Sequence, residues 1–555
     1  MLSRHARFAI ATLLVLGCGG SAAPPKDGGA GGSLGGQGGA GSGTGGIGGV
    51  GGSGTGGSPP MPTGASVFNG DSASLLTQGP PCTWEKGATG DRWCAFIAAS
   101  VATPGNGDLF VVNVTKAAAG TAITCGLTDA NCLKLTGNYG ENADHPALFG
   151  GDTLVYYELT GTPFGWRPGM TAGRALAVAD PVTLDVVLCT PDTKGTAVYC
   201  LRDLPDAMQT DPTNLLLSDL LVGKLDGAAS PPLVKVETVI AANRADMNFP
   251  HFQVDFPVPG SDTIAWSARA TPAGPEILKM QTIGNDASRA TVATGINSWR
   301  GSPDGSRWYW LSGVDEMTQA GMLQSATYPG GANGVALAPG TIQYDFPTPT
   351  SLLVVDTGKN MLGFADPTGA PTVSAPVDIG VIAFIALSAQ GHAGYVKTVS
   401  TTAGGTTFTN LFVKKADGTG ACTITMPTDG YPFDFIFTPS SGGVAWIQQA
   451  VTSVLARYTR LSDCTAMTVG SNVVWVEPIG DRAVLYMDGY TSATGTANMQ
   501  VRNVVAGAVS ADAATLVSRQ VGTFTSTSSG GADLVIYTVN GGGNDDGVYV
   551  RSFGP

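Results

Sequence analysis

Thirteen consecutive residues, Ser298-Trp-Arg-Gly-Ser-Pro-Asp-Gly-Ser-Arg-Trp-Tyr-Trp310, decide the fold that the sequence predicts. Pro303 presets the first dihedral angle of a turn, Asp304 hydrogen-bonds back to the backbone, and Gly305 accepts a left-handed conformation. Apolar and aromatic residues on both sides of the turn are typical of β-strands. We therefore predict that a strand running along a central axis reverses here into the next strand.

The strand after this turn has counterparts along the whole chain after residue 63. With a weaker copy at Thr196 we count about ten such runs, about 40 to 65 residues apart, which is the scale of a four-stranded propeller blade. The runs begin at Asp91, Asp152, Thr196, Asp262, Ser306, Ser351, Ala393, Gly443, Asp481 and Asp533. Most are followed by a second strand, as at Leu109–Val114, Arg174–Ala179, Asn410–Lys415 and Val548–Ser552.

This pattern predicts an all-β domain over residues 64–555, a single large β-propeller of four-stranded blades. Between about eight and ten blades fit the spacing, and fewer blades with long inserted loops are the alternative. One segment also fits a helix, because Trp446, Ala450, Tyr458 and their neighbours fall near one helical face. We prefer two strands joined near residues 450–453, which keep this unit in phase with the others.

The two ends of the domain are predicted to meet in one sheet. The last unit begins at Asp533 and ends near Phe553, so it needs a further strand to be complete. A strand between Ala65 and Leu76 would supply it and protect two sheet edges.

The stretch Ser298–Trp310 resembles the Ser-Pro-Asp-Gly (PD40-type) blade motif of the TolB-like β-propeller family. Phe435–Trp446 looks like a degenerate second copy, and His145–Asp152 and His251–Asp262 stand at the same place before their strands. The resemblance implies a propeller fold, and its motif is structural. Family members pair a six-bladed propeller with a small α/β domain in the periplasm, whereas this chain has more units and a different N-terminus.

The first 63 residues have the features of an exported, tethered protein. Residues 1–17 read as a signal peptide, with Arg4 and Arg7 before a short apolar run. Val15-Leu16-Gly17-Cys18 resembles the bacterial lipobox, which implies lipidation of Cys18 and a membrane anchor; ordinary cleavage with an incidental cysteine is the alternative. Residues 18–63 are rich in Gly and Ser and are predicted to form a disordered linker.

The resemblance to lipoproteins also implies a place in the cell envelope. Gly19 follows Cys18, where an aspartate commonly retains lipoproteins at the inner membrane, so the outer membrane is the expected destination. Exposure to the periplasm or to the exterior is left open.

The cysteine count agrees with export. Lipidation of Cys18 would leave eight of nine cysteines, an even number, in an oxidising compartment. Three pairs that are close in sequence could form disulfides that crosslink loops or hairpins: Cys82 with Cys94, Cys125 with Cys132, and Cys189 with Cys200. Cys422 and Cys464 are the two that remain. The spacings do not match a zinc site, and we predict no bound metal.

The formal net charge of −13 becomes −15 when the signal peptide and its two arginines are removed. Nucleic acid is therefore not an expected partner, because its recognition needs a basic stripe. The expected partners are the membrane, through the lipid, and an unknown protein, peptide or glycan. We expect a monomer.

Candidate binding residues are those expected near the axial funnel, where all blades converge. These are His145, His251 and Arg300. The histidines could transfer protons or bind a ligand, and Arg300 could bind a carboxylate or phosphate; a structural role within the blades is the alternative. The loop Asn540–Gly547 offers oxygen ligands for calcium without the spacing of an EF-hand. No cofactor is otherwise predicted.

The sequence favours a non-enzymatic binding module, because it shows neither a catalytic pair of carboxylates nor a histidine with a partner. No catalytic residue is therefore assigned. A hydrolase or lyase with its site in the axial funnel is one alternative. A passive structural component of the envelope is the other, and it would be favoured if Trp299, Trp308 and Trp310 plugged the funnel.

Overall fold

The computed structural model describes residues Gly64–Phe553, all of which belong to one compact unit from Pro62 to Pro555. Within this range the model does not describe residues 71–72, 77–80, 84–89, 100–106, 140–146, 177–185, 205–214, 226–232, 244–251, 259, 270–273, 316, 331–333, 365–375, 389, 398–399, 403–404, 408–409, 426–430, 451–452, 493, 530–531 and 541–544. The predicted signal peptide, Cys18 and the linker therefore lie outside the described residues.

Antiparallel sheets make up almost all of the described structure, with one short helix, α2 (Val114–Ala118). Six sheets have four strands, one has seven, one has eight and one is a two-stranded hairpin. The two larger sheets each consist of two four-stranded sets that share a long strand, β21 (Val335–Thr348) or β39 (Thr515–Ser529). We refer to each four-stranded set as a blade and number the ten described sets in chain order.

The first five blades contain the following strands. Blade 1 has β2 (Ser74–Leu75), β3 (Trp93–Ala99), β4 (Gly107–Asn113) and β5 (Cys132–Tyr139). Blade 2 has β6 (Leu148–Gly150), β7 (Thr153–Tyr157), β8 (Pro163–Trp166) and β9 (Arg174–Ala175). Blade 3 has β10 (Val186–Pro191), β11 (Ala197–Asp203), β12 (Leu215–Lys224) and β13 (Val234–Asn243). Blade 4 has β14 (Phe252–Asp255), β15 (Thr263–Arg269), β16 (Glu276–Thr282) and β17 (Asn285–Thr294). Blade 5 has β18 (Ile296–Gly301), β19 (Arg307–Ser312), β20 (Gly321–Thr327) and the first part of β21.

The other five blades continue in the same order. Blade 6 has the second part of β21, β22 (Ser351–Asp356), β23 (Asn360–Phe364) and β24 (Asp378–Ile379). Blade 7 has β25 (Val381–Leu387), β26 (His392–Lys397), β29 (Asn410–Lys415) and β30 (Cys422–Thr425), with the hairpin β27 (Ser400–Thr402) and β28 (Gly405–Thr407) between β26 and β29. Blade 8 has β31 (Tyr431–Phe437), β32 (Gly443–Ala450), β33 (Ser453–Arg460) and β34 (Thr465–Ser471). Blade 9 has β35 (Val473–Ile479), β36 (Ala483–Thr491), β37 (Thr496–Val505) and the first part of β39, with β38 (Ala508–Val509) on β37. Blade 10 has the second part of β39, β40 (Ala532–Val539), β41 (Gly547–Phe553) and β1 (Ala65–Asn69).

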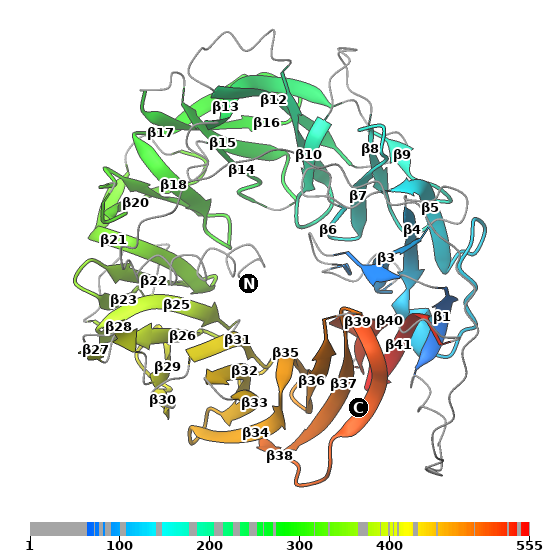
Figure 1. Cartoon of the computed structure of the whole chain (residues 1–555). Helices are drawn as coiled ribbons and strands as arrows, with labels where there is room; N and C mark the ends of the chain where they lie inside the picture. The colour runs from blue at the N-terminus through cyan, green and yellow to red at the C-terminus, as the bar shows by residue number, and fades with distance from the viewer. Residues whose placement is uncertain are drawn as a thin grey trace, which may run out of the picture. The chain divides into compact units, whose positions relative to one another are not determined.

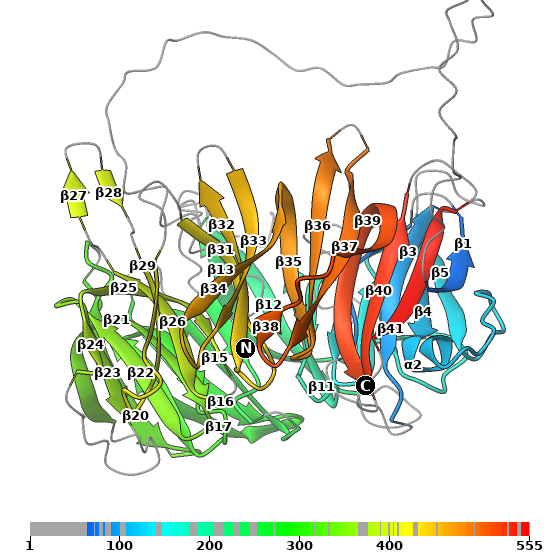
Figure 2. The same ribbon diagram turned by 90° about the horizontal axis from the view of Figure 1, so that it is seen from below.

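The blades follow one another in chain order around a central region (Figure 1). The first strand of a blade lies toward the centre, as β14, β18 and β35 do, and the fourth lies toward the outside, as β17 and β34 do (Figure 1). Figure 2 shows the strands of neighbouring blades side by side, and the β27–β28 hairpin standing apart from the rest of blade 7. The architecture is a β-propeller, which confirms the predicted fold class.

The N-terminal strand lies in the same sheet as the C-terminal strands. β1 pairs antiparallel with β41, with Ala65 opposite Val550 and Phe68 opposite Val548. The chain then continues to β2, which is the first strand of blade 1. Blade 10 thus takes its outer strand from the start of the domain and its other strands from the end.

Apolar side chains pack between neighbouring blades, because successive residues of a strand point to opposite faces of the sheet. On β19, Trp308 and Trp310 contact blade 4, while Tyr309 and Leu311 contact blade 6. Equivalent clusters join each blade to the next, and one joins β40 and β41 of blade 10 to β3 and β4 of blade 1. These interfaces form the core of the domain.

The segment that also fitted a helix is two strands, β32 and β33, with Ala450 opposite Ser453. This confirms the prediction from the phase of the repeats. Trp446 on β32 is fully buried against blade 7 and Tyr458 on β33 packs toward blade 9, so alternation across the sheet explains both apolar positions. Within the described ranges, no helix is long and apolar enough to span a bilayer.

Candidate ligand-binding site

The tight turn after β18 fixes the end of the strand that carries Arg300. The N–H of Gly305 donates to the carbonyl of Ser302 at 2.8 Å, and the Asp304 carboxylate accepts from the N–H of Ser306 at 3.0 Å. Gly305 has a φ of 69°, and a Cβ there would lie 2.8 Å from a methyl group of Val258 in blade 4. The turn therefore needs glycine for its conformation and for its contact with the neighbouring blade.

The three tryptophans near this turn belong to the core between blades 4 and 5. Trp299, Trp308 and Trp310 are 1%, 0% and 3% exposed and pack around Ala265 and Leu278 of blade 4. The rings of Trp299 and Trp308 meet edge to face at 5.7 Å. These side chains therefore fill the space between two sheets and are not a plug of the axis.

Arg300 lies on β18, the first strand of blade 5, and its side chain is about half exposed. Its guanidinium forms an ion pair with Asp345 on β21 of blade 6 at 2.6 Å and lies over the ring of Tyr344, 5.8 Å from its centroid. On the other side, the charge of Arg300 acts on Asp255 of β14 in blade 4. The contacts of Arg300 thus connect the inner strands of blades 5 and 6.

A repeated Gln-x-Asp-Phe-Pro sequence, at 253–257 and 343–347, supplies polar groups on both sides of Arg300. In each copy the aspartate accepts a hydrogen bond from the next backbone N–H, at 2.7 Å in the first and 2.8 Å in the second. In each copy the glutamine bonds to the first strand of the following blade: Gln253 donates to the Trp299 carbonyl at 2.7 Å, and Gln343 accepts from the Phe384 N–H at 3.1 Å. Sequence reasoning missed these residues, although an internal comparison of blades would have shown the repeat.

The side chains around Arg300 border a hollow of about 270 Å³. Its lining comes from β14, β18, β19 and β21, and consists of Gln253, Ser298, Trp299, Arg300, Leu311, Ile342, Gln343 and Tyr344. Ile342 on β21 is 39% exposed. The hollow therefore offers hydrogen-bonding groups beside an accessible apolar surface, the combination typical of small ligand sites.

Asp255, at the end of β14, is exposed. Burial raises the pKa of Tyr344, which lines the hollow, to about 12, so its hydroxyl is protonated at neutral pH. That hydroxyl donates to the Tyr309 carbonyl at 3.3 Å.

The other predicted site residues are distributed as follows. His145 and His251 lie outside the described residues, as do residues 541–544 of the loop proposed for calcium. A histidine that the sequence analysis did not select, His392, lies at the start of β26, and burial lowers its pKa. Its backbone N–H donates to Ser388 Oγ at 2.9 Å, the same arrangement that Ser306 makes with Ser302 in the turn of blade 5. Within the described ranges, no group of three or more His, Cys, Asp or Glu is arranged to hold a metal ion.

All eight candidate cysteines form disulfides, which confirms the prediction of disulfide bonds. The pairs are Cys82–Cys94, Cys125–Cys132, Cys189–Cys200 and Cys422–Cys464. The first three bonds lie within single blades, whereas Cys422 of β30 and Cys464, which follows β33, join blades 7 and 8.

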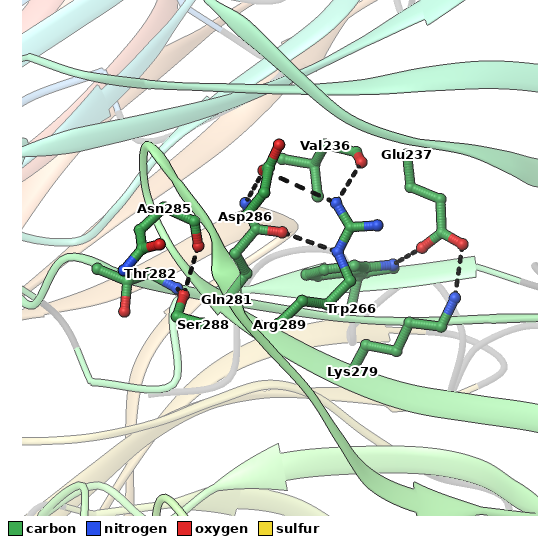
Figure 3. Close-up of polar contacts among 10 residues, drawn as sticks. All are labelled: Val236, Glu237, Trp266, Lys279, Gln281, Thr282, Asn285, Asp286, Ser288 and Arg289. Atoms are coloured by element: carbon green, nitrogen blue, oxygen red, sulfur yellow. Dashed lines mark hydrogen bonds and ion pairs between the residues drawn. The ribbon is translucent and has the colours of Figure 1, made fainter.

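A second polar cluster joins blades 3 and 4 (Figure 3). Glu237 on β13 accepts hydrogen bonds from Trp266 and Lys279 of blade 4, at 2.8 and 2.5 Å. Arg289 lies over the Trp266 ring and donates to the Val236 carbonyl at 2.7 Å. These groups satisfy one another and Trp266 is fully buried, so we assign this cluster to the stability of the blade interface.

Comparison with known proteins gives likenesses of fold only. No protein-family profile matches the chain, and no curated protein sequence is similar to it. The structure resembles a crystal structure of the eukaryotic initiation factor, with 12% identity over 77% of this chain and 96% of that chain and a TM-score of 0.45. It also resembles the tricorn protease (12% identity, 89% of this chain and 53% of that chain, TM-score 0.30). A third similar structure is the β-propeller domain of the Trilobed protease from Pyrococcus furiosus (9% identity, 60% and 96%, TM-score 0.30). At these TM-scores the likenesses carry no functional assignment.

Proposed function

We propose that this protein is an exported lipoprotein, anchored through Cys18, whose propeller is a binding module for a protein, peptide or glycan. The observation that carries the binding role is the hollow beside Arg300. The first strands of three consecutive blades contribute to it, so its geometry is held by the packed core and needs no loop to form it. Rigid placement of polar groups lowers the entropy cost of binding.

The TolB-like family remains part of this proposal. Its support is the Pro303-Asp304-Gly305 turn and the four-stranded blades. We place the protein at the outer membrane of the cell envelope, because Gly19 follows Cys18. An acidic exported domain on a long polar linker suits binding away from the lipid.

The binding role is tested by filling the hollow. Ile342→Trp would place a larger side chain at an accessible position in the lining, and Val335→Trp is the matched control on the same strand, β21, at a position that is 52% exposed and outside the lining. Full-length protein would be applied to arrays of peptides and oligosaccharides. We expect Ile342→Trp to weaken binding by about tenfold or more while Val335→Trp leaves it unchanged. Equal binding by both variants would contradict the proposal.

The anchor is tested by growth with a clickable fatty acid. We expect the wild-type chain to carry the label and to partition with membranes, and Cys18→Ala to lose both properties. A labelled Cys18→Ala chain would contradict lipidation at this residue.

A further inference from the structure

We propose that the hollow beside Arg300 takes an uncharged sugar unit of a glycan. This inference rests on the proposed binding function and specifies its ligand. It depends on three observations: the charge around Arg300, the hydrogen-bonding groups of the lining, and the size and apolar surface of the hollow.

The charges around the hollow disfavour an ionic ligand. Arg300 is in the lining, but its guanidinium is already paired with Asp345 at 2.6 Å. An anion would therefore meet a cation that is already paired and would be repelled by the Asp345 carboxylate. A cation in the hollow would face the guanidinium directly. A neutral polar ligand avoids both costs.

The polar groups of the lining match a ligand rich in hydroxyl groups. Gln343 Oε1 is occupied by the Phe384 N–H, so the Gln343 amide can offer its N–H donors to a ligand. Arg300 has five N–H donors in a planar fork, and the contact with Asp345 uses one nitrogen. The Ser298 hydroxyl interacts with the Tyr344 hydroxyl, and its oxygen can still accept from a ligand. Planar donors beside a hydroxyl suit adjacent hydroxyl groups on one ring.

The remaining surface and the volume fit a single ring. Ile342, which is 39% exposed, offers an apolar contact to the C–H face of a sugar. A hollow of about 270 Å³ lies just below the usual range for sites that enclose a drug-sized molecule. We therefore expect one unit of a longer glycan to enter it while the rest of the glycan lies outside.

The test changes the donors of the lining without changing its shape. Gln343→Glu keeps an oxygen that accepts from the Phe384 N–H, but it removes the N–H donors and adds a negative charge. The matched control is Gln324→Glu on β20 of blade 5, outside the lining. Gln324 Nε2 donates to Ser312 Oγ at 2.6 Å, and a Glu at this position would accept a hydrogen bond from the same hydroxyl. Full-length wild type and both variants would be applied to arrays of neutral oligosaccharides, acidic oligosaccharides and peptides, with thermal unfolding as a check of folding.

We expect the wild type to bind neutral oligosaccharides, with a loss of about tenfold or more in Gln343→Glu and none in Gln324→Glu. Preference for acidic oligosaccharides, or binding that Gln343→Glu does not weaken, would overturn the sugar assignment. Binding to peptides alone, weakened by Gln343→Glu, would overturn it and leave the proposed binding function intact. If no probe binds in a manner that depends on the hollow, both proposals fail.

Discussion

Arg300 on β18 and Asp345 on β21 form an ion pair, 2.6 Å between guanidinium nitrogen and carboxylate oxygen, that joins the inner strands of blades 5 and 6. The two side chains are 45% and 13% exposed, so water screens the pair only in part. We expect a coupling free energy of about 0.5 to 1 kcal/mol between them. A double-mutant cycle with Arg300→Met and Asp345→Asn, followed by urea unfolding, measures it. If the destabilisations of the two single variants add up to that of the double variant within about 0.3 kcal/mol, the ion pair contributes nothing to folding.

Asp378 on β24 should make the stability depend on pH in the acid range. Burial alone would raise its pKa, but hydrogen bonds from Lys397 and Tyr395 of blade 7 outweigh this effect and hold its pKa at about 2. A carboxyl whose pKa is lowered by folding stabilises the protein above its unfolded pKa of about 4, and this contribution is lost as the pH falls from about 4 to about 2.

The variant Asp378→Asn tests this expectation. It should be less stable than the wild type at pH 7, by about 1 to 2 kcal/mol, and the difference should shrink as the pH falls below 4. Urea unfolding at pH 7, 4 and 3 would measure the difference. A difference that is the same at all three values would mean that the Asp378 charge is not the cause.

Alanine substitutions at Gly305 and Gly313 can be compared to isolate the contribution of the contact between blades 4 and 5. Both have a positive φ, 69° and 58°, but a Cβ at Gly305 would lie 2.8 Å from Val258, whereas a Cβ at Gly313 has no neighbour within 4 Å. Alanine at Gly313 should cost about 1 kcal/mol from backbone strain alone. Alanine at Gly305 should cost about 1 to 3 kcal/mol more. Equal unfolding midpoints for the two variants would argue against close packing at this turn.

The disulfides should differ in their effects on stability. Cys422–Cys464 spans 42 residues and joins two blades, whereas Cys125–Cys132 spans 7 residues within blade 1. Because loop-closure entropy grows with the length of the closed loop, the double Ser variant of the first pair should lose about 1 to 1.5 kcal/mol more than that of the second. Thermal unfolding under non-reducing conditions would compare them. A larger loss for the short loop would reverse the expected order.

The sequence predicts one strand of each blade well and the others poorly. The ten predicted runs correspond to the second strand of each blade, as β19 does after Ser306 and β40 does after Asp533. These strands are buried on both faces, so they appear as continuous apolar runs. The first and fourth strands give weaker signals, because β2 has only two residues and most of β17 is exposed.

The candidate site could be predicted only in part. Arg300 was a candidate because its distance from a recognisable turn placed it on an inner strand. The role of Gln343 could not be predicted, because its amide group acts through Phe384 on the next blade, and that neighbour is fixed by the packing of whole sheets. In the sequence, Cys422 and Cys464 were only the two cysteines left after the other candidates had been paired with near neighbours. Their spacing gave no signal of its own, because the bond joins two different blades.

The most direct test of the binding role is a crystal structure of the full-length protein with the neutral oligosaccharide that binds most strongly on the array. The account predicts density for one sugar ring in the hollow, within hydrogen-bond distance of Arg300 and Gln343 and against Ile342. Density for the oligosaccharide elsewhere on the propeller, with the hollow unchanged, would contradict it.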